Sequence, residues 1–312
     1  ATDDFQDLGL TSSKENMRSI DSYHNRQRIL SFFGRVNYDY ASKYLLSLVV
    51  RRDGYSKLID NRWGTFPGLS AGWIFSKENF MNSLSDVISF GKLRASYGLN
   101  GNVSGIGSYD LQGAYATSTN YNGNATFIMS GVPNPTLRWE KSKTFEFGLD
   151  LSYLNNRYST NFTVYNRLTD DKYARISLPI SSGISGITTN NGRFRNRGVE
   201  IELAAKPIQS KNWNWSMNAN ISYNKNVIVK LPNNGLEKNR QDAYQVYTGN
   251  GNDKMWVGGY QEGNEPGVLY AYQAEGIYKS YDEIPDIMVD RGGGSSACVL
   301  YGKSSWANLT DA

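Results

Sequence analysis

The stretch WNWSMNANISYN, residues 213–224, alternates apolar and polar residues without interruption. Successive side chains of a β-strand point to opposite faces, so such a strand has one wholly apolar face and one wholly polar face. The apolar set is Trp213, Trp215, Met217, Ala219, Ile221 and Tyr223, and the polar set is Asn214, Ser216, Asn218, Asn220, Ser222 and Asn224. The stretch therefore predicts a strand that separates two different environments.

Seven further stretches repeat this alternation along the chain. Their apolar rows are, in order, Leu30, Phe32, Val36, Tyr38 and Tyr40; Tyr44, Leu46, Leu48 and Val50; Leu69, Ala71, Trp73 and Phe75; Leu93, Ala95 and Tyr97; Phe145, Phe147, Leu149, Leu151 and Tyr153; Tyr158, Phe162 and Val164; and Val199, Ile201, Leu203 and Ala205. The best helical-period stretch, residues 78–88, is short enough for one or two turns inside a connection. The pattern favours an all-β protein.

The connections between these stretches alternate in length. Residues 41–43, 77–88, 155–156 and 207–211 are short connections, and residues 53–65, 100–137, 169–193 and 227–266 are long ones. In an up-and-down antiparallel meander every second connection lies at the same rim, so the short connections share one rim and the long ones the other. Outer-membrane barrels have this asymmetry, with short periplasmic turns and long outer loops.

A soluble sandwich also has one apolar face per strand, and three features favour the membrane barrel over it. The stretches run to ten residues or more, as a tilted strand needs to cross a bilayer. Aromatic residues collect beside the short connections, where an interfacial girdle belongs. The polar rows are rich in Ser, Asn, Thr and Gly, which suits a water-filled interior.

Composition agrees with this interpretation. The mean hydropathy is −0.54, aromatic residues make up 13% of the chain, and no apolar run reaches the ~20 residues of a transmembrane helix. One cysteine, Cys298, excludes an internal disulfide, and one histidine, His24, argues against a histidine-based metal site. The net charge of +4 comes from scattered residues and does not favour nucleic-acid binding. The start at Ala1 without a signal sequence is expected for a mature or truncated product.

Several ordered motifs resemble the barrel of SusC/RagA-type TonB-dependent transporters of Bacteroidetes. They are SFFGRVNYDYASKYLL (31–46), VRRDGYSKL (50–58), NRWGTFPGLSAGW (61–73), GKLRASYGLNGN (91–102), NPTLRWEKSKTFEFGLD (134–150), NNGRFRNRGVEIEL (190–203) and SMNANISYNKNVIVKLP (216–232). The resemblance implies an antiparallel up-and-down meander that is an open segment of a large barrel with about 22 strands. The rival architecture is a complete, closed eight-stranded barrel.

The domain organisation expected from this resemblance has three parts. Residues 1–26 form an extracellular loop segment, residues 27–226 the transmembrane strands with their long extracellular loops, and residues 227–312 a long extracellular loop region that stops before the next strand. The N-terminal plug and TonB box of the family are not visible in the chain.

The resemblance implies a multi-pass protein of the outer membrane, in contact with its lipid, that is a transporter and not an enzyme. It would import oligosaccharides, or oligopeptides, together with a SusD-like surface lipoprotein and the TonB complex, which acts through the missing N-terminal region. A siderophore or cobalamin receptor of the same broad class is one alternative, and a soluble β-rich lectin or adhesin is another. No cofactor, metal or nucleic acid is expected.

Charged residues in the polar rows are the first candidates for function. They are expected to face the barrel lumen, where they would hold the plug or line the path: Arg35, Asp39, Arg51, Asp53, Lys92, Arg94, Glu146, Asp150, Glu200 and Glu202. Glu200 and Glu202, two apart on one face, also suit paired acid and base catalysis. The favoured interpretation is that they face Arg or Lys on a neighbouring strand.

Aromatic residues in the long connections are the second set of candidates. Tyr115, Tyr121, Trp256 and Tyr260 lie among Gly, Asn, Ser and Gln. Aromatic faces with amide and hydroxyl neighbours suit sugar rings, which present apolar C–H faces and hydroxyl rims. The alternative is that these residues only stiffen exposed loops.

Overall fold

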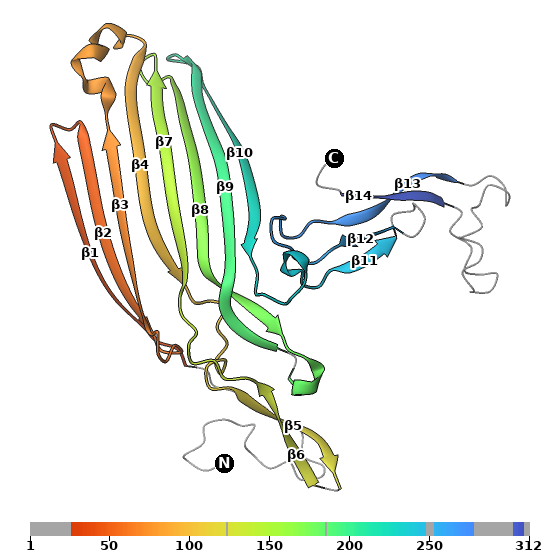
Figure 1. The fold of residues 1–312 in the computed structure, drawn as a ribbon. Helices are drawn as coiled ribbons and strands as arrows, with labels where there is room; N and C mark the ends of the chain where they lie inside the picture. Colours follow the sequence, from red (N-terminus) through yellow and green to blue (C-terminus); the bar gives the residue numbers. More distant parts are fainter. Residues whose placement is uncertain (1–25, 123, 185, 248–252, 278–301, 309–312) are drawn as a thin grey trace.

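The chain forms one large, open, antiparallel sheet with three small hairpins outside it (Figure 1). The computed structural model describes residues 26–122, 124–184, 186–247, 253–277 and 302–308. The eight strands of the large sheet are β1 (Ile29–Tyr40), β2 (Tyr44–Tyr55), β3 (Trp63–Trp73), β4 (Ile88–Asn102), β7 (Glu140–Tyr153), β8 (Tyr158–Ser177), β9 (Gly186–Gln209) and β10 (Asn214–Lys230). Within the described ranges, no helix has the length and apolar character needed to cross a membrane.

The strand order β1-β2-β3-β4-β7-β8-β9-β10 confirms the up-and-down meander. The first hairpin has the expected register, with Tyr40 opposite Tyr44 and Ser31 opposite Asp53. In the described part of the chain no ladder joins β1 to β10, so the sheet has two free edges. The open segment is therefore confirmed, and the closed eight-stranded barrel is rejected.

Turns at one end of the sheet are tight, as the sequence predicts. Ala41 and Ser42 adopt left-handed φ angles of 54° and 52°, and Asp39 Oδ1 accepts a hydrogen bond of 2.8 Å from the Ser42 N–H. In the β3–β4 connection, the 3-10 helix η3 (Asn79–Leu84) lies where helical turns are expected. The expectation that Phe75 continues the third strand row is wrong, because β3 ends at Trp73 and Phe75 begins the 3-10 helix η2 (Phe75–Lys77). This rim is called the short-connection end, and the opposite rim the long-connection end.

The long connections are more structured than predicted. The loop expected at residues 169–193 is wrong over most of its length, because β8 continues to Ser177 and β9 begins at Gly186, leaving only the turn with η4 (Ile180–Ser182). Similarly, β10 continues to Lys230, beyond the boundary expected at residue 226. Residues 1–25 and 278–301 of the expected extracellular segments lie outside the described residues.

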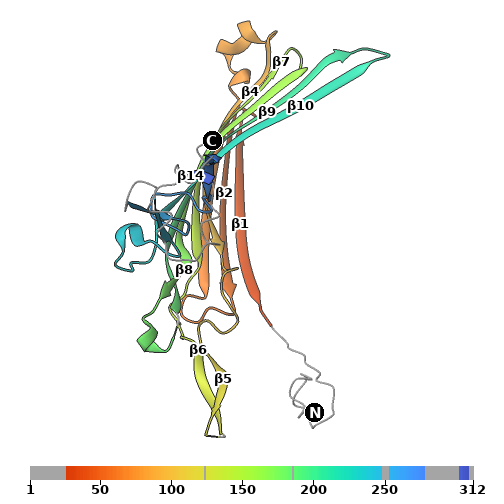
Figure 2. The ribbon, with the colours of Figure 1, turned by 90° about the vertical axis from the view of Figure 1, so that its right-hand side faces the viewer.

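The remaining elements are hairpins within the long connections. They are β5 (Ala114–Tyr121) with β6 (Asn124–Gly131), β11 (Tyr244–Tyr247) with β12 (Lys254–Val257), and β13 (Tyr270–Ile277) with β14 (Gly302–Asn308). The 3-10 helix η5 (Glu237–Asn239) precedes β11. Figure 2 shows the sheet bending along its strands, and in both views the β5–β6 hairpin extends beyond the long-connection end.

The ladders sort the strand residues onto two faces. One continuous row joins Tyr40, Tyr44, Trp73, Leu93, Leu149, Phe162, Ile201 and Ile221. A row on the other face joins Asn37, Ser47, Ser70, Ser96, Glu146, Tyr165, Gly198 and Asn224. These faces are called the apolar face and the polar face.

The apolar band crosses the ladders obliquely. The row that begins at Tyr40, the last apolar residue of β1, reaches β10 at Ile221. The apolar residues that lead into β10 begin at Trp213, which is eight residues from Ile221 toward the short-connection end. Eight residues of about 3.3 Å over seven strand spacings of about 4.8 Å give a tilt of roughly 40°. Strands of outer-membrane barrels are tilted by ~35–45°, so a flat membrane fits this band.

The sheet opens between β3 and β4 near the long-connection end. Their ladder covers only Gly68 to Trp73 against Leu93 to Gly98, and it stops at Pro67, which has no N–H to donate. The Phe66 ring fills the opening and packs on Trp139 with ring centroids 5.3 Å apart. These rings belong to the buried core of the structure, which also contains Tyr55, Leu58, Ile106, Leu111 and Leu137.

Candidate functional site

All ten charged candidates of the polar rows share the polar face of the sheet. The registers place Arg35 opposite Val49, Arg94 opposite Gly148, and Glu200 opposite Thr163 and Ser222, all on the same side as Asn37 and Ser47. The candidates nonetheless spread over five strands, so the structure brings them together as a surface and not as a compact centre. That this surface faces the lumen stays a prediction.

Partners differ among these charged residues. Arg94 pairs with Asp150 at 3.2 Å, and Arg51 pairs with Asp53 at 2.8 Å. Asp39 caps the first turn. The Glu146 carboxylate accepts a long hydrogen bond of 3.5 Å from the Ser96 hydroxyl.

The expectation that Glu200 and Glu202 face Arg or Lys across the ladder is wrong. Glu200 lies opposite Thr163 and Ser222, and Glu202 lies opposite Asn161 and Asn220. Asn161 Nδ2 donates a hydrogen bond of 3.3 Å to Glu202 Oε2. The direct ladder partners of both carboxylates are therefore small and neutral, and within the described ranges neither carboxylate forms an ion pair with Arg or Lys.

A hollow of about 470 Å³ lies on this part of the polar face. Its lining is mostly polar and includes Arg94, Glu146, Thr163, Tyr165, Glu200 and Asn224. Gly148 and Gly198 leave room for larger side chains here. A Cβ at Gly148 would collide with the Arg94 side chain, and a Cβ at Gly198 would collide with the Tyr165 ring. The face therefore alternates long charged side chains with bare backbone, which suits dispersed polar contacts.

Glu140 organises the long-connection end of the sheet. Its side chain is almost fully buried, with 4% of the residue exposed, at the first position of β7. Its carboxylate accepts hydrogen bonds of 2.8 Å from Asn102 Nδ2 and from the backbone N–H of Tyr173. Lys172 Nζ adds an ion pair at 3.6 Å. A buried carboxylate needs such partners, so this one holds β4, β7 and β8 together.

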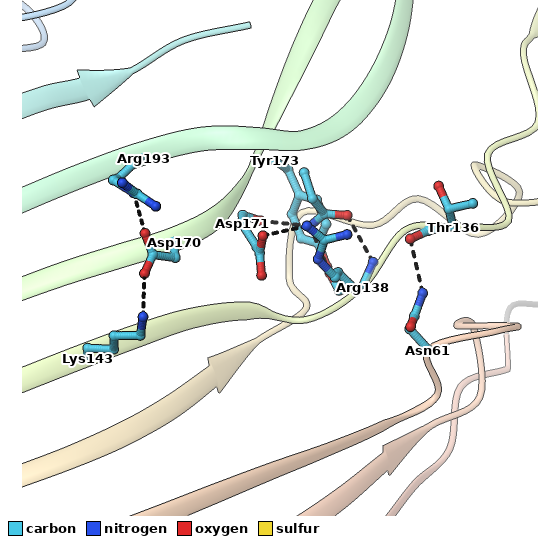
Figure 3. A network of polar contacts seen from close by, with 9 residues as sticks. Asn61, Thr136, Arg138, Lys143, Asp170, Asp171, Tyr173 and Arg193 are labelled. Carbon is cyan, nitrogen blue, oxygen red and sulfur yellow. Dashed lines mark hydrogen bonds and ion pairs between the residues drawn. The ribbon is translucent and has the colours of Figure 1, made fainter.

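Arg138 links the same end of the sheet to the loops (Figure 3). Its guanidinium donates to Asp171 at 2.7 Å, and its carbonyl accepts hydrogen bonds from Tyr173 Oη at 2.6 Å and Asn190 Nδ2 at 2.9 Å. The hydrogen bond to Asp171 raises the pKa of Arg138 above its ordinary value. Nearby, Asn61 Nδ2 donates to the Thr136 carbonyl at 3.1 Å. Four segments distant in sequence are thereby fixed into one platform.

Three of the four aromatic loop candidates have described side chains, and these do not form one cluster. Tyr115 is 73% exposed on the β5–β6 hairpin. Tyr260 is 47% exposed beside β12, where its backbone pairs with Gln241. The half-buried Trp256 carries the Arg240 guanidinium 4.3 Å from its ring centroid, so this ring face is already covered. Tyr121 has a described backbone at the end of β5.

Sequence reasoning missed the residues that build the platform. Asn134, Arg138, Trp139 and Glu140 all lie in the NPTLRWE segment, whose resemblance to the family assigns no roles to single residues. Asn190 likewise begins the NNGRFRNRGVEIEL segment. A dense mix of Asn, Arg, Trp and Glu at a strand entrance was the available signal, since such residues are seldom buried without partners.

Comparisons with known proteins agree on one family. The model for the family described as "TonB dependent receptor-like, beta-barrel" matches residues 2–308. The TonB-dependent receptor P39 of Formosa agariphila is 34% identical over 271 residues, which cover 86% of this chain and 24% of that receptor. The TonB-dependent receptor SusC of Bacteroides thetaiotaomicron is 34% identical over 294 residues, which cover 89% of this chain and 28% of SusC.

Solved structures give the same answer. The structure of the RagAB peptide transporter matches with a TM-score of 0.68 at 29% identity, covering 85% of this chain and 28% of that chain. The RagAB peptide importer in its "closed-closed" state matches with a TM-score of 0.69 at 27% identity, covering 88% of this chain and 29% of that chain. The chain spans about a quarter of the length of the curated relatives, at 24% and 28%.

Proposed function

The chain belongs to the TonB-dependent receptors, as an open segment of a SusC/RagA-type outer-membrane barrel, and on this premise we propose that it takes part in TonB-dependent import of oligosaccharides. The family consists of transporters and not of enzymes, and its barrels lie in the outer membrane. The single observation that carries the transport part of the proposal is the family match over residues 2–308. The soluble lectin or adhesin is thereby set aside.

The polar face is the proposed interior of the barrel. Supporting this role, its charges are dispersed, and several, such as Glu200 and Glu202, lie among small neutral side chains. A plug that must move needs many weak, hydrated contacts in place of a few strong buried ones. Arg94, Glu146 and the hollow around them are the proposed contacts of the plug or of the substrate path.

The long-connection end is the proposed extracellular mouth. The Glu140 and Arg138 platform supports the loops there, and Tyr115 and Tyr260 extend from it with exposed rings. Exposed aromatic faces among Asn, Gln and Gly suit the apolar faces and hydroxyl rims of sugars. A SusD-like surface lipoprotein is the proposed partner at this end, and the TonB complex is the proposed source of energy.

An oligopeptide is the second candidate substrate, favoured by the likeness to a structure described as the RagAB peptide transporter. A siderophore or cobalamin would instead be expected to gather aromatic and cationic groups around a compact ligand. Among the described candidates, Tyr115 lies on the β5–β6 hairpin and Tyr260 lies after β12, so the two form no such cluster.

Growth of a strain whose only copy of the intact transporter carries Tyr115→Ala and Tyr260→Ala would test the substrate. Growth on the cognate oligosaccharide should fall, because stacking contacts are lost, while barrel assembly stays normal. Tyr109→Ala is the matched control, since Tyr109 is also exposed in a long connection, at 63%. Unchanged use of oligosaccharides together with lost use of peptides or iron chelates would reject the sugar and keep only the transporter class.

A further inference from the structure

We propose that cations on the apolar face, at the long-connection end of the sheet, bind the phosphate groups of lipid headgroups in the outer leaflet. The face changes character there within a single ladder row. Val36, Leu48, Leu69, Tyr97 and Phe145 of this row are apolar, Asn166 follows on β8, and Arg197 and Lys225 complete it on β9 and β10.

The strand tilt explains why one row contains both kinds of residue. A tilt of roughly 40° makes the membrane plane cut the ladders obliquely, so β9 and β10 leave the hydrocarbon at an earlier row than β1 and β2. The position of the first cation on each strand shifts in the same direction. On β7, Lys143 lies two residues beyond Phe145, and on β2, Arg52 lies four residues beyond Leu48. The cations therefore follow the upper edge of the apolar band.

Further cations continue above this edge. The set on the apolar face, called the cationic belt, comprises Arg52, Lys141, Lys143, Arg193, Arg195, Arg197 and Lys225. Two acids accompany the belt. Asp170 bridges Lys143, at 2.8 Å, and Arg193, and Glu265 lies 3.7 Å from Lys225. Seven cations against two acids leave an excess of five positive charges.

Several of these cations are available to a ligand. Among the described residues, Arg197 is exposed and its side chain has no hydrogen-bond or ion-pair partner. Arg195 is half-buried, and its Nε is buried without a hydrogen-bond partner. Asp170 is shielded, with 12% of its side chain exposed, whereas the side chains of its partners Lys143 and Arg193 are 43% and 47% exposed. The buried acid thus orients two cations while their outer surfaces stay open.

The position of the cationic belt indicates which ligand it meets. Arg197 and Lys225 lie directly beyond Val199 and Tyr223 of the apolar band, so they meet whatever stands above hydrocarbon, which is a headgroup. Guanidinium groups bind phosphate oxygens through paired N–H donors. At the short-connection end, the corresponding positions of the band are aromatic instead, with Tyr40, Tyr44, Tyr153 and Tyr158. The cationic belt therefore lies at one end of the apolar band, and aromatic residues occupy the other end.

Lipid binding to the intact transporter tests the proposal. The protein is purified in mild detergent, stripped of lipid and offered lipid A carrying two phosphates, with binding measured by native mass spectrometry. Arg195→Gln with Arg197→Gln should weaken binding by roughly 30-fold, because each cation near an anionic lipid surface contributes roughly fivefold to the affinity. Binding should also weaken as ionic strength rises.

Matched variants and probes distinguish phosphate binding at the belt from general effects of charge and assembly. Arg35→Gln with Lys92→Gln removes the same charge from the polar face and should leave lipid binding unchanged. Arg195→Lys with Arg197→Lys should retain most of it, and heat-modifiable migration in gels checks that every variant forms a barrel. The proposal would be overturned if all variants bound lipid equally, or if lipid without phosphates bound equally well. Displacement of the lipid by inorganic phosphate, or a changed oligomeric state with unchanged lipid binding, would also overturn it.

Discussion

Neighbouring residues of β2 meet different surroundings, and Leu48 and Ser47 show this at the scale of the single residue. Leu48 lies on the apolar face between Val36 and Leu69, whereas the Ser47 hydroxyl donates to Asn37 Oδ1 on the polar face at 2.7 Å. Leu48→Arg should cost about 2–4 kcal/mol if it meets the bilayer midplane, and Ser47→Arg much less. Denaturant unfolding of the intact protein in lipid measures both, and equal costs would contradict a lipid-facing Leu48.

Glu140 is a second residue whose chemistry has a structural consequence. Gln has the same shape but only one acceptor oxygen, so Glu140→Gln leaves either Asn102 or the Tyr173 N–H facing an amide donor. We expect a loss of roughly 1–3 kcal/mol, seen as faster proteolysis of the long connections. Glu146→Gln on the same strand is the control, because the hydrogen bond that Glu146 accepts from Ser96 is long, at 3.5 Å.

At the scale of elements, the opening between β3 and β4 depends on glycine as much as on Pro67. A Cβ at Gly101 would overlap the Phe66 ring that fills the opening. Gly101→Val should therefore destabilise the barrel by roughly 1–3 kcal/mol, and adding Phe66→Ala should recover part of that loss. Gly34→Ala, with no heavy atom within 4 Å of the new Cβ, should be nearly neutral. Additive effects of the two changes would contradict this packing.

The β3–β4 connection is fastened to the neighbouring hairpin by Glu78. Its carboxylate accepts hydrogen bonds from Tyr44 Oη at 2.8 Å, Lys43 Nζ at 3.0 Å and Trp73 Nε1 at 3.2 Å, which lower the pKa of Glu78. A lowered folded-state pKa gives stability that is present above the ordinary pKa and is lost as pH falls through the folded-state pKa.

We therefore expect the melting temperature of the intact protein to fall as the pH drops from about 7 to about 3, with part of this fall due to Glu78. Glu78→Gln cannot ionise, so its melting temperature should be lower at neutral pH and should change less with acid. A parallel pH dependence in the two proteins would show that Glu78 does not contribute.

For the whole molecule, alternating connection lengths predict which rim faces outward. The β1–β2 turn at Ser42 and the η4 turn at Gly183 lie at opposite ends of the sheet (Figure 1). An epitope inserted at Gly183, whose Cβ position is open, should be labelled on whole cells, and one inserted at Ser42 should be reached only after the outer membrane is opened. The reverse pattern would invert the topology.

The sequence by itself determined the number of strands in the large sheet, their order and the shared face of the ten charged candidates. Alternation is a local property, because each side chain points opposite to its neighbour whatever the rest of the chain does. Residues as distant as Arg35 and Glu202 were therefore assigned to one face correctly.

Only the tertiary structure decided what lies beyond the bilayer and across the ladders. The extensions of β8 to Ser177 and β9 from Gly186 carry no clean alternation in their sequences, so periodicity did not reveal that the strands continue there. The partners of Glu140, Glu200 and Trp256 come from segments far away in the chain. Periodicity records which solvent a face meets, whereas register and loop packing depend on contacts that form only when distant segments meet.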